Sequence, residues 1–250
     1  MITNANASHS VALVTGAARR IGATLAMGLH ASGMRVALHY RHAQTEASAL
    51  QTRMETQRPG STALFRADLT DQAALSTLVA AVVERFGRLD LLVHNASSFY
   101  PTPLGETRLE HWEDLMATNL RSPFFLTQAA LPALREARGS VVHLLDIHAR
   151  RPLRGYSVYC AAKAGAVMLV KALAQELGPE VRVNGISPGA ILWPETPASE
   201  AKQQMILERT ALHRAGTPED IWLALRFLVF DAPYMTGQVL TLDGGRTLHQ

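Results

Sequence analysis

The sequence predicts an α/β fold, a single domain built on a doubly wound parallel β-sheet. Three features of the 250 residues indicate this fold. Short apolar runs alternate with helical stretches of roughly 10–20 residues, which is the pattern of βαβ units. The apolar runs are continuous rather than alternating, as expected for strands that helices cover on both faces. No linker rich in glycine, proline or serine divides the chain, so we expect one domain over residues 1–250.

Seven short apolar runs are the expected strands. The first run ends in a turn that contains glycine, and a helical stretch follows it. Most of the later runs are separated in the same way by one helical stretch. The expected strands are residues 10–15, 36–40, 62–66, 89–94, 141–145, 181–187 and 239–242.

The expected helices lie between these strands. Apolar residues at helical spacing, Ile21, Leu25 and Leu29, indicate the first helix, and Gly33 ends it. Asp71 stands near the start of the third helix. The expected helices are residues 20–32, 45–57, 71–86, 157–177 and 218–230, with two more helical stretches between the fourth and fifth strands.

Two segments that we expect to be flexible lie outside the alternation of strands and helices. Residues 1–9 are polar and resemble no secretory signal, so we expect a flexible N-terminus. Pro194, Pro197 and small polar residues mark a segment after the sixth strand. We expect residues 191–210 to form a substrate lid.

Composition and charge exclude several classes of function. A net charge of +3 is too small for a nucleic-acid binder, and no apolar run approaches the length of a membrane span. The single cysteine, Cys160, allows no intramolecular disulfide. The histidines are not spaced like metal ligands, so we expect no metal site. We therefore expect a cytoplasmic protein whose partner is a small molecule.

The turn after the first strand has the features of a phosphate-binding loop. Residues 15–22 read TGAARRIG and lie between a strand and a helix. Such a turn presents backbone N–H groups at a helix N-terminus, where pyrophosphate binds favourably. We expect a dinucleotide to contact Gly16, Arg19, Arg20, Ile21 and Gly22.

The residues at the end of the second strand indicate which dinucleotide binds there. NAD sites place a carboxylate there to bind the ribose 2′-hydroxyl, yet residues 22–44 contain neither Asp nor Glu. A cationic end that is rich in hydrogen-bond donors suits a 2′-phosphate and favours NADP(H). The alternative is a solvated basic loop. The residues concerned are His39, Tyr40, Arg41 and His42.

Polar residues close the third and fourth strands as well. Since carboxyl ends of parallel strands meet at one edge of the sheet, we expect these residues beside the same ligand. An aspartate there can bind the adenine amino group. The residues are Asp68, Leu69, Asn95, Ala96 and Ser97.

A tyrosine and a lysine stand four residues apart in the helix expected over residues 157–177. This spacing stacks Tyr159 and Lys163 on one helix face. A nearby ammonium stabilises phenolate, so we expect the pKa of Tyr159 to be lowered and the phenol to exchange protons near neutral pH. Such pairs also arise by chance on helix surfaces.

Together, these motifs resemble the short-chain dehydrogenase/reductase family over residues 11–245. The ordered set includes residues 15–22, residues 95–97, Asn119, the Tyr159/Lys163 pair and the Asn184…Pro188-Gly189 segment. The resemblance implies a Rossmann-type, seven-stranded sheet. It also implies a homotetramer in which the fourth and fifth long helices pack across subunits.

The resemblance implies roles for individual residues. Tyr159 is the proton donor, Lys163 holds the nicotinamide ribose and Asn119 organises a water relay. Pro188, Gly189 and Ile191 border the nicotinamide, with Ile191 contributing its backbone.

Three departures from the common family pattern resemble the pteridine reductase subgroup. Arg20 stands where a glycine is usual, Asp146 replaces the catalytic serine, and residues 97–103 read SSFYPTP. The subgroup reduces pterins and folates with NADPH. The residues then expected at the substrate are Arg20, Ser97, Phe99, Asp146, Tyr159, Leu192 and Trp193.

The resemblance therefore implies hydride transfer to a pterin of the dihydrobiopterin or dihydromonapterin type, and also to dihydrofolate or folate. Tyr159 would protonate the adjacent nitrogen, Asp146 would bind the amino and ring N–H groups, and Phe99 would stack on the pterin. The alternatives are a short-chain ketone or 3-oxoacyl reductase, and a silent NADP-binding regulator. Phe99 as a packing residue and Asp146 as a turn cap also stay open. Gln250 stands where some pteridine reductases carry an arginine that reaches a neighbouring active site.

Overall fold

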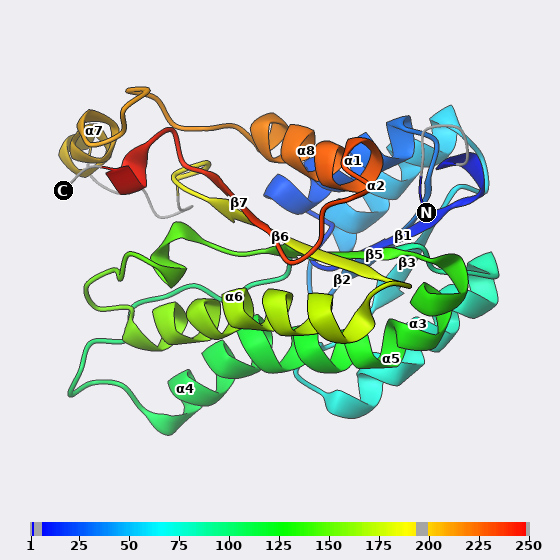
Figure 1. Ribbon diagram of the computed structural model, residues 1–250, viewed down its shortest axis with the longest axis horizontal. Coiled ribbons are helices and arrows are strands. Elements are labelled where there is room, and N and C mark those ends of the chain that lie inside the picture. The colour runs from blue at the N-terminus through cyan, green and yellow to red at the C-terminus, as the bar shows by residue number, and fades with distance from the viewer. Residues whose placement is uncertain (1, 3–6, 194–199, 249–250) are drawn as a thin grey trace.

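Seven parallel strands form one sheet in the order β3-β2-β1-β4-β5-β6-β7 (Figure 1). The computed structural model describes residue 2 and residues 7–193 and 200–248, with the side chain of residue 202 excepted. The masked parts of the expected N-terminus and lid, and Gln250, lie outside the described residues. The strands are β1 (Val11–Val14), β2 (Arg35–Tyr40), β3 (Thr62–Arg66), β4 (Leu91–His94), β5 (Ser140–Leu144), β6 (Arg182–Pro188) and β7 (Val239–Leu242).

Helices cover both faces of this sheet. Figure 1 shows α1 (Arg20–Ala31), α2 (Gln44–Gln57) and α8 (Pro218–Arg226) on one face, and α3 (Gln72–Phe86), α5 (Ser122–Ala137) and α6 (Ser157–Leu177) on the other. The remaining helices are α4 (Leu109–Met116) and α7 (Glu200–Glu208). Short 3₁₀ or π turns are η1 (Ala7–His9), η2 (Ala117–Arg121), η3 (Ile147–Ala149), η4 (Phe227–Asp231) and η5 (Arg246–Leu248).

The predicted fold class, a single α/β domain with a doubly wound parallel sheet, is confirmed. All seven expected strands form within a few residues of their predicted bounds. Asp71 stands at the start of α3 as predicted, and its carboxylate caps the helix by accepting a hydrogen bond from the Ala73 N–H at 3.0 Å. Two details differ: the helix expected over residues 218–230 ends at Arg226 and continues as a π turn, and α7 lies inside the expected lid.

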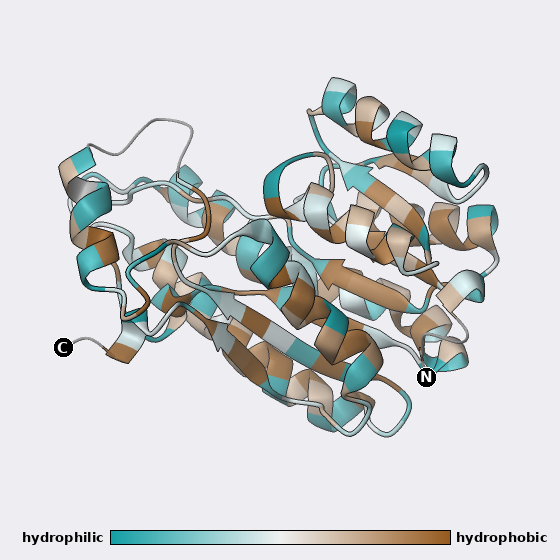
Figure 2. Cartoon of the chain, turned by 90° about the horizontal axis from the view of Figure 1, so that it is seen from above, coloured by the Kyte–Doolittle hydropathy of each residue, from teal (hydrophilic) through white to brown (hydrophobic). Residues whose placement is uncertain are grey.

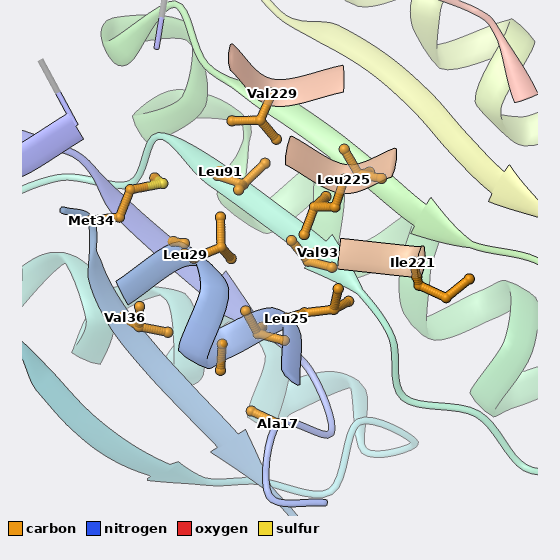
Figure 3. Close-up of a cluster of buried hydrophobic side chains, with 14 of the residues drawn as sticks. Ala17, Leu25, Leu29, Met34, Val36, Leu91, Val93, Ile221, Leu225 and Val229 are labelled. Carbon is orange, nitrogen blue, oxygen red and sulfur yellow. The ribbon is translucent and has the colours of Figure 1, made fainter. Parts of the chain in front are cut away.

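Two apolar cores lie on opposite faces of the sheet. The first joins α1 and α8 to the strands, and Figure 3 shows Leu25, Leu29, Val93 and Leu225 converging there. The second joins α3, α5 and α6 to the other face. In Figure 2 the helices carry both brown and teal segments, as expected for elements with one buried and one exposed side.

The order of the strands creates a crevice between β1 and β4. The chain leaves β1 toward β2 and β3, and it later returns to β4 on the other side of β1. At such a switch point the following loops diverge, and ligands bind outside the carboxyl ends of the strands. The fold therefore fixes the location of the site before any side chain is considered.

Helix α6 is long and apolar enough to span a membrane by length and composition alone, although no continuous apolar run in the sequence has that length. Half of the most apolar stretch of 18 residues in α6 is buried inside the molecule, where the helix packs against the sheet. Core helices of this kind pass the same test as membrane spans.

Two leucines on α8 test the first core. Leu225 is fully buried, whereas Leu223 is 57% exposed. We expect Leu225→Ala to lower the free energy of unfolding by about 2–5 kcal/mol, because a cavity forms where the side chain packed. Leu223→Ala is the matched control and should change it by less than about 0.5 kcal/mol. Urea unfolding measures both, and equal losses would contradict this packing.

Candidate active site

A hydroxyl and an amide join the ends of β1 and β4 at the crevice. The Thr15 hydroxyl accepts hydrogen bonds from the N–H groups of Asn95 (2.9 Å) and Ala96 (3.0 Å), and it donates to the Val93 carbonyl at 3.2 Å. The Asn95 amide donates in turn to the carbonyls of Thr15 (2.9 Å) and Gly16 (3.0 Å). This network holds the start of the glycine turn against the end of β4.

The glycine turn is tight enough to require two of its residues to be glycine. Gly16 has a φ of +61°, and a Cβ on Gly22 would lie 2.2 Å from the Gly16 carbonyl oxygen. Arg20 has a φ of +54°, in the left-handed region that favours glycine. Its guanidinium donates to the Trp193 carbonyl at 3.2 Å and so spans the crevice.

A cavity of about 440 Å³ lies at the carboxyl ends of the first four strands. The cofactor residues predicted from those strand ends all line it, namely Gly16, Arg19, Arg20, Ile21, Gly22, His39, Tyr40, Arg41, His42, Asp68, Leu69, Asn95, Ala96 and Ser97. The sequence analysis missed five further lining residues, which are Ala18, Ala43, Thr70, Ser98 and Thr118.

The predicted nicotinamide residues after β6 lie apart from this cavity. Ile191 is buried and lines a second cavity of about 450 Å³ with residues 241–245 and the start of α8. Gly189 packs so closely on β7 that an added Cβ would lie 2.8 Å from the Asp243 Cα. Pro188 is the last residue of β6. Of the predicted substrate residues, Leu192 is exposed and Trp193 is half-buried.

His39 differs from the cationic group that the sequence suggested. Its Nδ1 accepts a hydrogen bond from the Gly16 N–H at 3.1 Å, so its Nε2–H donates to the Ala67 carbonyl at 3.1 Å. Burial lowers the pKa of His39 to about 4, and the ring is therefore neutral at physiological pH. Its neutral ring supports the glycine turn.

Two arginines at this end lie near the surface. Arg41 forms an ion pair with Asp68 at 2.8 Å, and Arg19 forms one with Glu46 at 3.6 Å. Both arginines are about half exposed, which leaves them able to exchange partners with a bound anion.

Asp146 and Tyr159 form the central hydrogen bond of the site. The Tyr159 hydroxyl donates to the Asp146 Oδ2 at 2.7 Å. The other carboxylate oxygen, Oδ1, accepts from the His148 N–H at 2.8 Å and caps η3. The capping role considered for Asp146 is thus correct, and the same carboxylate also faces the tyrosine.

Lys163 lies beneath this pair. Its ammonium donates to the Leu144 carbonyl at 3.0 Å and lies 5.7 Å from the centre of the Tyr159 ring. Burial lowers the pKa of Lys163 to about 8, against the opposing effect of Asp146. The predicted stacking of Tyr159 and Lys163 on α6 is present, and both side chains are buried.

The predicted lowering of the Tyr159 pKa is wrong for this arrangement. Burial raises the pKa of Tyr159 well above its ordinary value, and the negative charge and hydrogen bond of Asp146 raise it further. The prediction rested on the ammonium of Lys163 alone, whereas the contact between Asp146 and Tyr159 shifts the pKa in the opposite direction. A carboxylate that accepts a hydrogen bond from the phenol stabilises the neutral phenol.

Asn119 connects the site to the loop after β4. It lies in the π turn η2, where its amide donates to the carbonyls of Leu115 and Ser98, each at 3.0 Å. Its amide oxygen accepts from the Ser97 hydroxyl at 2.6 Å. Asn119 therefore fixes the segment that leads to Phe99.

Two aromatic rings border the tyrosine. Phe99 is 46% exposed, stacks on Tyr156 with ring centres 4.7 Å apart, and presents an edge contact to Tyr159 at 4.8 Å. Phe99 therefore packs on its neighbours while part of the ring stays exposed, and its stacking on a pterin remains a prediction. The sequence analysis missed Tyr156; its only signal was its position three residues before Tyr159.

The residues present fit a dinucleotide. The glycine turn leaves no room for additional side chains, exposes N–H groups at the start of α1, and opens into the 440 Å³ cavity with flanking arginines. Within the described part of the chain, no three His, Cys, Asp or Glu residues gather where they could hold a metal ion.

Comparison with known proteins gives the family. A family model described as an enoyl-(acyl carrier protein) reductase matches residues 16–247. Pteridine reductase 1 of Leishmania tarentolae is 33% identical over 95% of the chain and 96% of that protein. A 3-oxoacyl-(acyl-carrier-protein) reductase of Synechocystis sp. is 33% identical over 95% and 97%, and a gluconate 5-dehydrogenase of Gluconobacter oxydans 36% over 96% of each. The protein therefore belongs to the short-chain dehydrogenase/reductase family of oxidoreductases, which use nicotinamide dinucleotides.

Proposed function

We propose that the protein is an NADPH-dependent pteridine reductase that reduces dihydrobiopterin-type pterins and also dihydrofolate or folate. The observation that carries this proposal is the hydrogen bond from Tyr159 to the Asp146 carboxylate, at a position where the family commonly has serine. A serine suits the carbonyl oxygen of a ketone substrate. A carboxylate instead complements a heterocycle that presents amino and ring N–H donors.

The aromatic surroundings support the same substrate class. The half-exposed Phe99 lies against Tyr159 and offers a surface for one face of a flat ring. The likeness to a pteridine reductase over nearly the whole chain also supports it. The alternative function, reduction of a 3-oxoacyl group or another ketone, is supported by relatives of similar identity, and Asp146 argues against it.

Each side chain at the site would have its own role in the reaction. When bound, NADPH supplies a hydride. The raised pKa of Tyr159 keeps the phenol protonated at neutral pH, ready to donate a proton to a substrate nitrogen. Asp146 holds the phenol and binds the donors of the substrate. Lys163 provides a positive charge beneath both groups, and Asn119 holds the Ser97–Phe99 segment.

We also propose NADP(H) as the cofactor. The end of β2 has no carboxylate for a ribose 2′-hydroxyl, and Arg19, Arg41 and His42 line the cavity there. Residues 191–210 would serve as the substrate lid, with α7 as their helical part.

We further propose that the protein is cytoplasmic and forms a homotetramer. The fourth and fifth long helices, α5 and α6, carry exposed apolar side chains on their outer faces. Phe124 is 36% exposed and Met168 is 62% exposed. Exposed apolar residues on adjacent helices favour burial against another subunit.

A panel of substrates tests the function. We expect NADPH oxidation with dihydrobiopterin and with dihydrofolate, and little with a simple β-keto ester. Asp146→Ser should lower kcat/KM for the pterin by about 10²-fold or more, because the carboxylate no longer binds the substrate or Tyr159. Turnover of the keto ester alone, or full pterin activity of Asp146→Ser, would contradict the proposal.

The pH dependence tests the roles of Tyr159 and Lys163. The pKa of Lys163 is lowered to about 8, so the ammonium is present below that pH and is lost as the pH rises through it. Tyr159 stays protonated over this range, because its pKa is raised. We expect kcat/KM for reduction to fall above about pH 8, and Lys163→Met to lower activity and remove this limb. A wild-type profile that stays flat to roughly pH 10 would show that Lys163 does not act in this way.

Cofactor preference tests Arg41. Arg41→Ala should raise KM for NADPH roughly tenfold and leave KM for NADH nearly unchanged, because a charge-assisted hydrogen bond to the 2′-phosphate is lost. Arg53→Ala, on the exposed face of α2, is the matched control. An equal rise for both cofactors would mean that Arg41 acts only through its ion pair with Asp68.

A further inference from the structure

Three exposed arginines follow Asp146 within a short segment of the active-site wall. Arg150, Arg151 and Arg154 are all exposed, and the segment that carries them ends at Tyr156, which stacks on Phe99. We call these three residues the arginine rim. The proposed function assigns them no role.

The backbone of the rim is held firmly beside the site. The N–H groups of Arg150 and Arg151 both donate to the Ile147 carbonyl at 3.0 Å, and the His148 ring donates from Nδ1 to the Arg151 carbonyl at 2.9 Å. The turn begins at Asp146, whose carboxylate caps it. Arg150 directly follows this turn, four residues after Asp146.

The other end of the segment is fixed to the loop that carries Phe99. The Thr102 N–H donates to the Gly155 carbonyl at 2.6 Å, and Thr102 pairs with Tyr156 as an isolated β-bridge. The rim is therefore bound to both walls of the proposed pterin site, with Asp146 at one end and the Phe99–Tyr156 stack at the other.

The positive charge of the rim is not neutralised by any carboxylate in the part of the chain that the structure describes. Among the described residues, no carboxylate forms an ion pair with Arg150, Arg151 or Arg154. Asp146 is engaged by Tyr159 and His148, and the first turn of α6 has no acidic residue. The facing segment, residues 99–108, has one carboxylate, Glu106. Among the described residues, the rim thus has guanidinium groups without a carboxylate partner at the edge of the site.

We propose that the arginine rim binds the carboxylates of an anionic tail on the pterin substrate, so that the enzyme favours glutamate-bearing pterins over pterins with a neutral tail. This inference rests on the proposed function. Guanidinium groups bind carboxylates through paired hydrogen bonds, and three arginines in five residues offer several such pairs. Since the tail is remote from the reacting atoms, the rim contributes to binding and leaves the chemical step unchanged.

The test compares two pterins in one triple variant, Arg150→Gln with Arg151→Gln and Arg154→Gln. We expect KM for dihydrofolate to rise roughly tenfold with kcat nearly unchanged, because each exposed charge pair contributes a few-fold to binding. KM for dihydrobiopterin, whose tail carries no charge, should stay the same. In the wild type, KM for dihydrofolate should rise with salt, and in the variant this dependence should be much weaker.

A second triple variant controls for net charge. Arg53→Gln, Arg85→Gln and Arg135→Gln remove three exposed charges from α2, α3 and α5, near the helix ends at the opposite edge of the sheet. This control should leave both KM values unchanged. Thermal unfolding midpoints of both variants verify that each still folds.

The outcomes separate the inference from the function on which it rests. If the wild type reduces neither pterin, the proposed function fails. If it reduces both, and the rim variant raises both KM values equally or neither, the function stands and the inference is wrong. A third outcome is that the wild type reduces a 3-oxoacyl group on acyl carrier protein but no pterin, and that the rim variant loses this activity. The rim would then bind a carrier protein, and both the inference and the proposed function would be overturned.

Discussion

The hydrogen bonds of the Thr15 hydroxyl and the Asn95 amide join two strands that the chain places far apart in sequence. β1 and β4 are neighbours only because the sheet reverses its order there, and their loops would otherwise diverge. By holding the glycine turn against the Asn95–Ser97 segment, these bonds form both walls of the cavity. Asn119 extends these hydrogen bonds to Ser97 and the segment that leads to Phe99, so the glycine turn and this segment are held in one frame.

Opposing charges act on Tyr159 within this frame. Lys163 lies below the ring, but its ammonium donates to the Leu144 carbonyl, whereas Asp146 accepts a hydrogen bond from the Tyr159 hydroxyl at 2.7 Å. The shorter and more direct interaction prevails, and the phenol is held in its protonated form. At neutral pH the group is therefore present as the protonated phenol, and little phenolate is available to act as a base.

Much of the fold and of the candidate site could be predicted from the sequence, because both depend on local patterns. Continuous apolar runs gave the strands, and i,i+4 spacing placed Tyr159 beside Lys163. Three features could not be predicted, because they depend on three-dimensional contacts. They are the hydrogen bond that His39 accepts from the Gly16 N–H, the raised pKa of Tyr159 and the stacking of Tyr156 on Phe99. No spacing rule states which way a side chain at a strand end will face, or which of two nearby charges will be closer.

Arg20 has a consequence for any attempt to stabilise this protein. A left-handed arginine costs roughly 1–2 kcal/mol relative to a backbone without strain, and a glycine would adopt the same conformation freely. Its guanidinium nevertheless reaches across the crevice to the Trp193 carbonyl. Selection for heat resistance alone would therefore favour exchanging this residue, and it would erode the contact that links the two sides of the cleft.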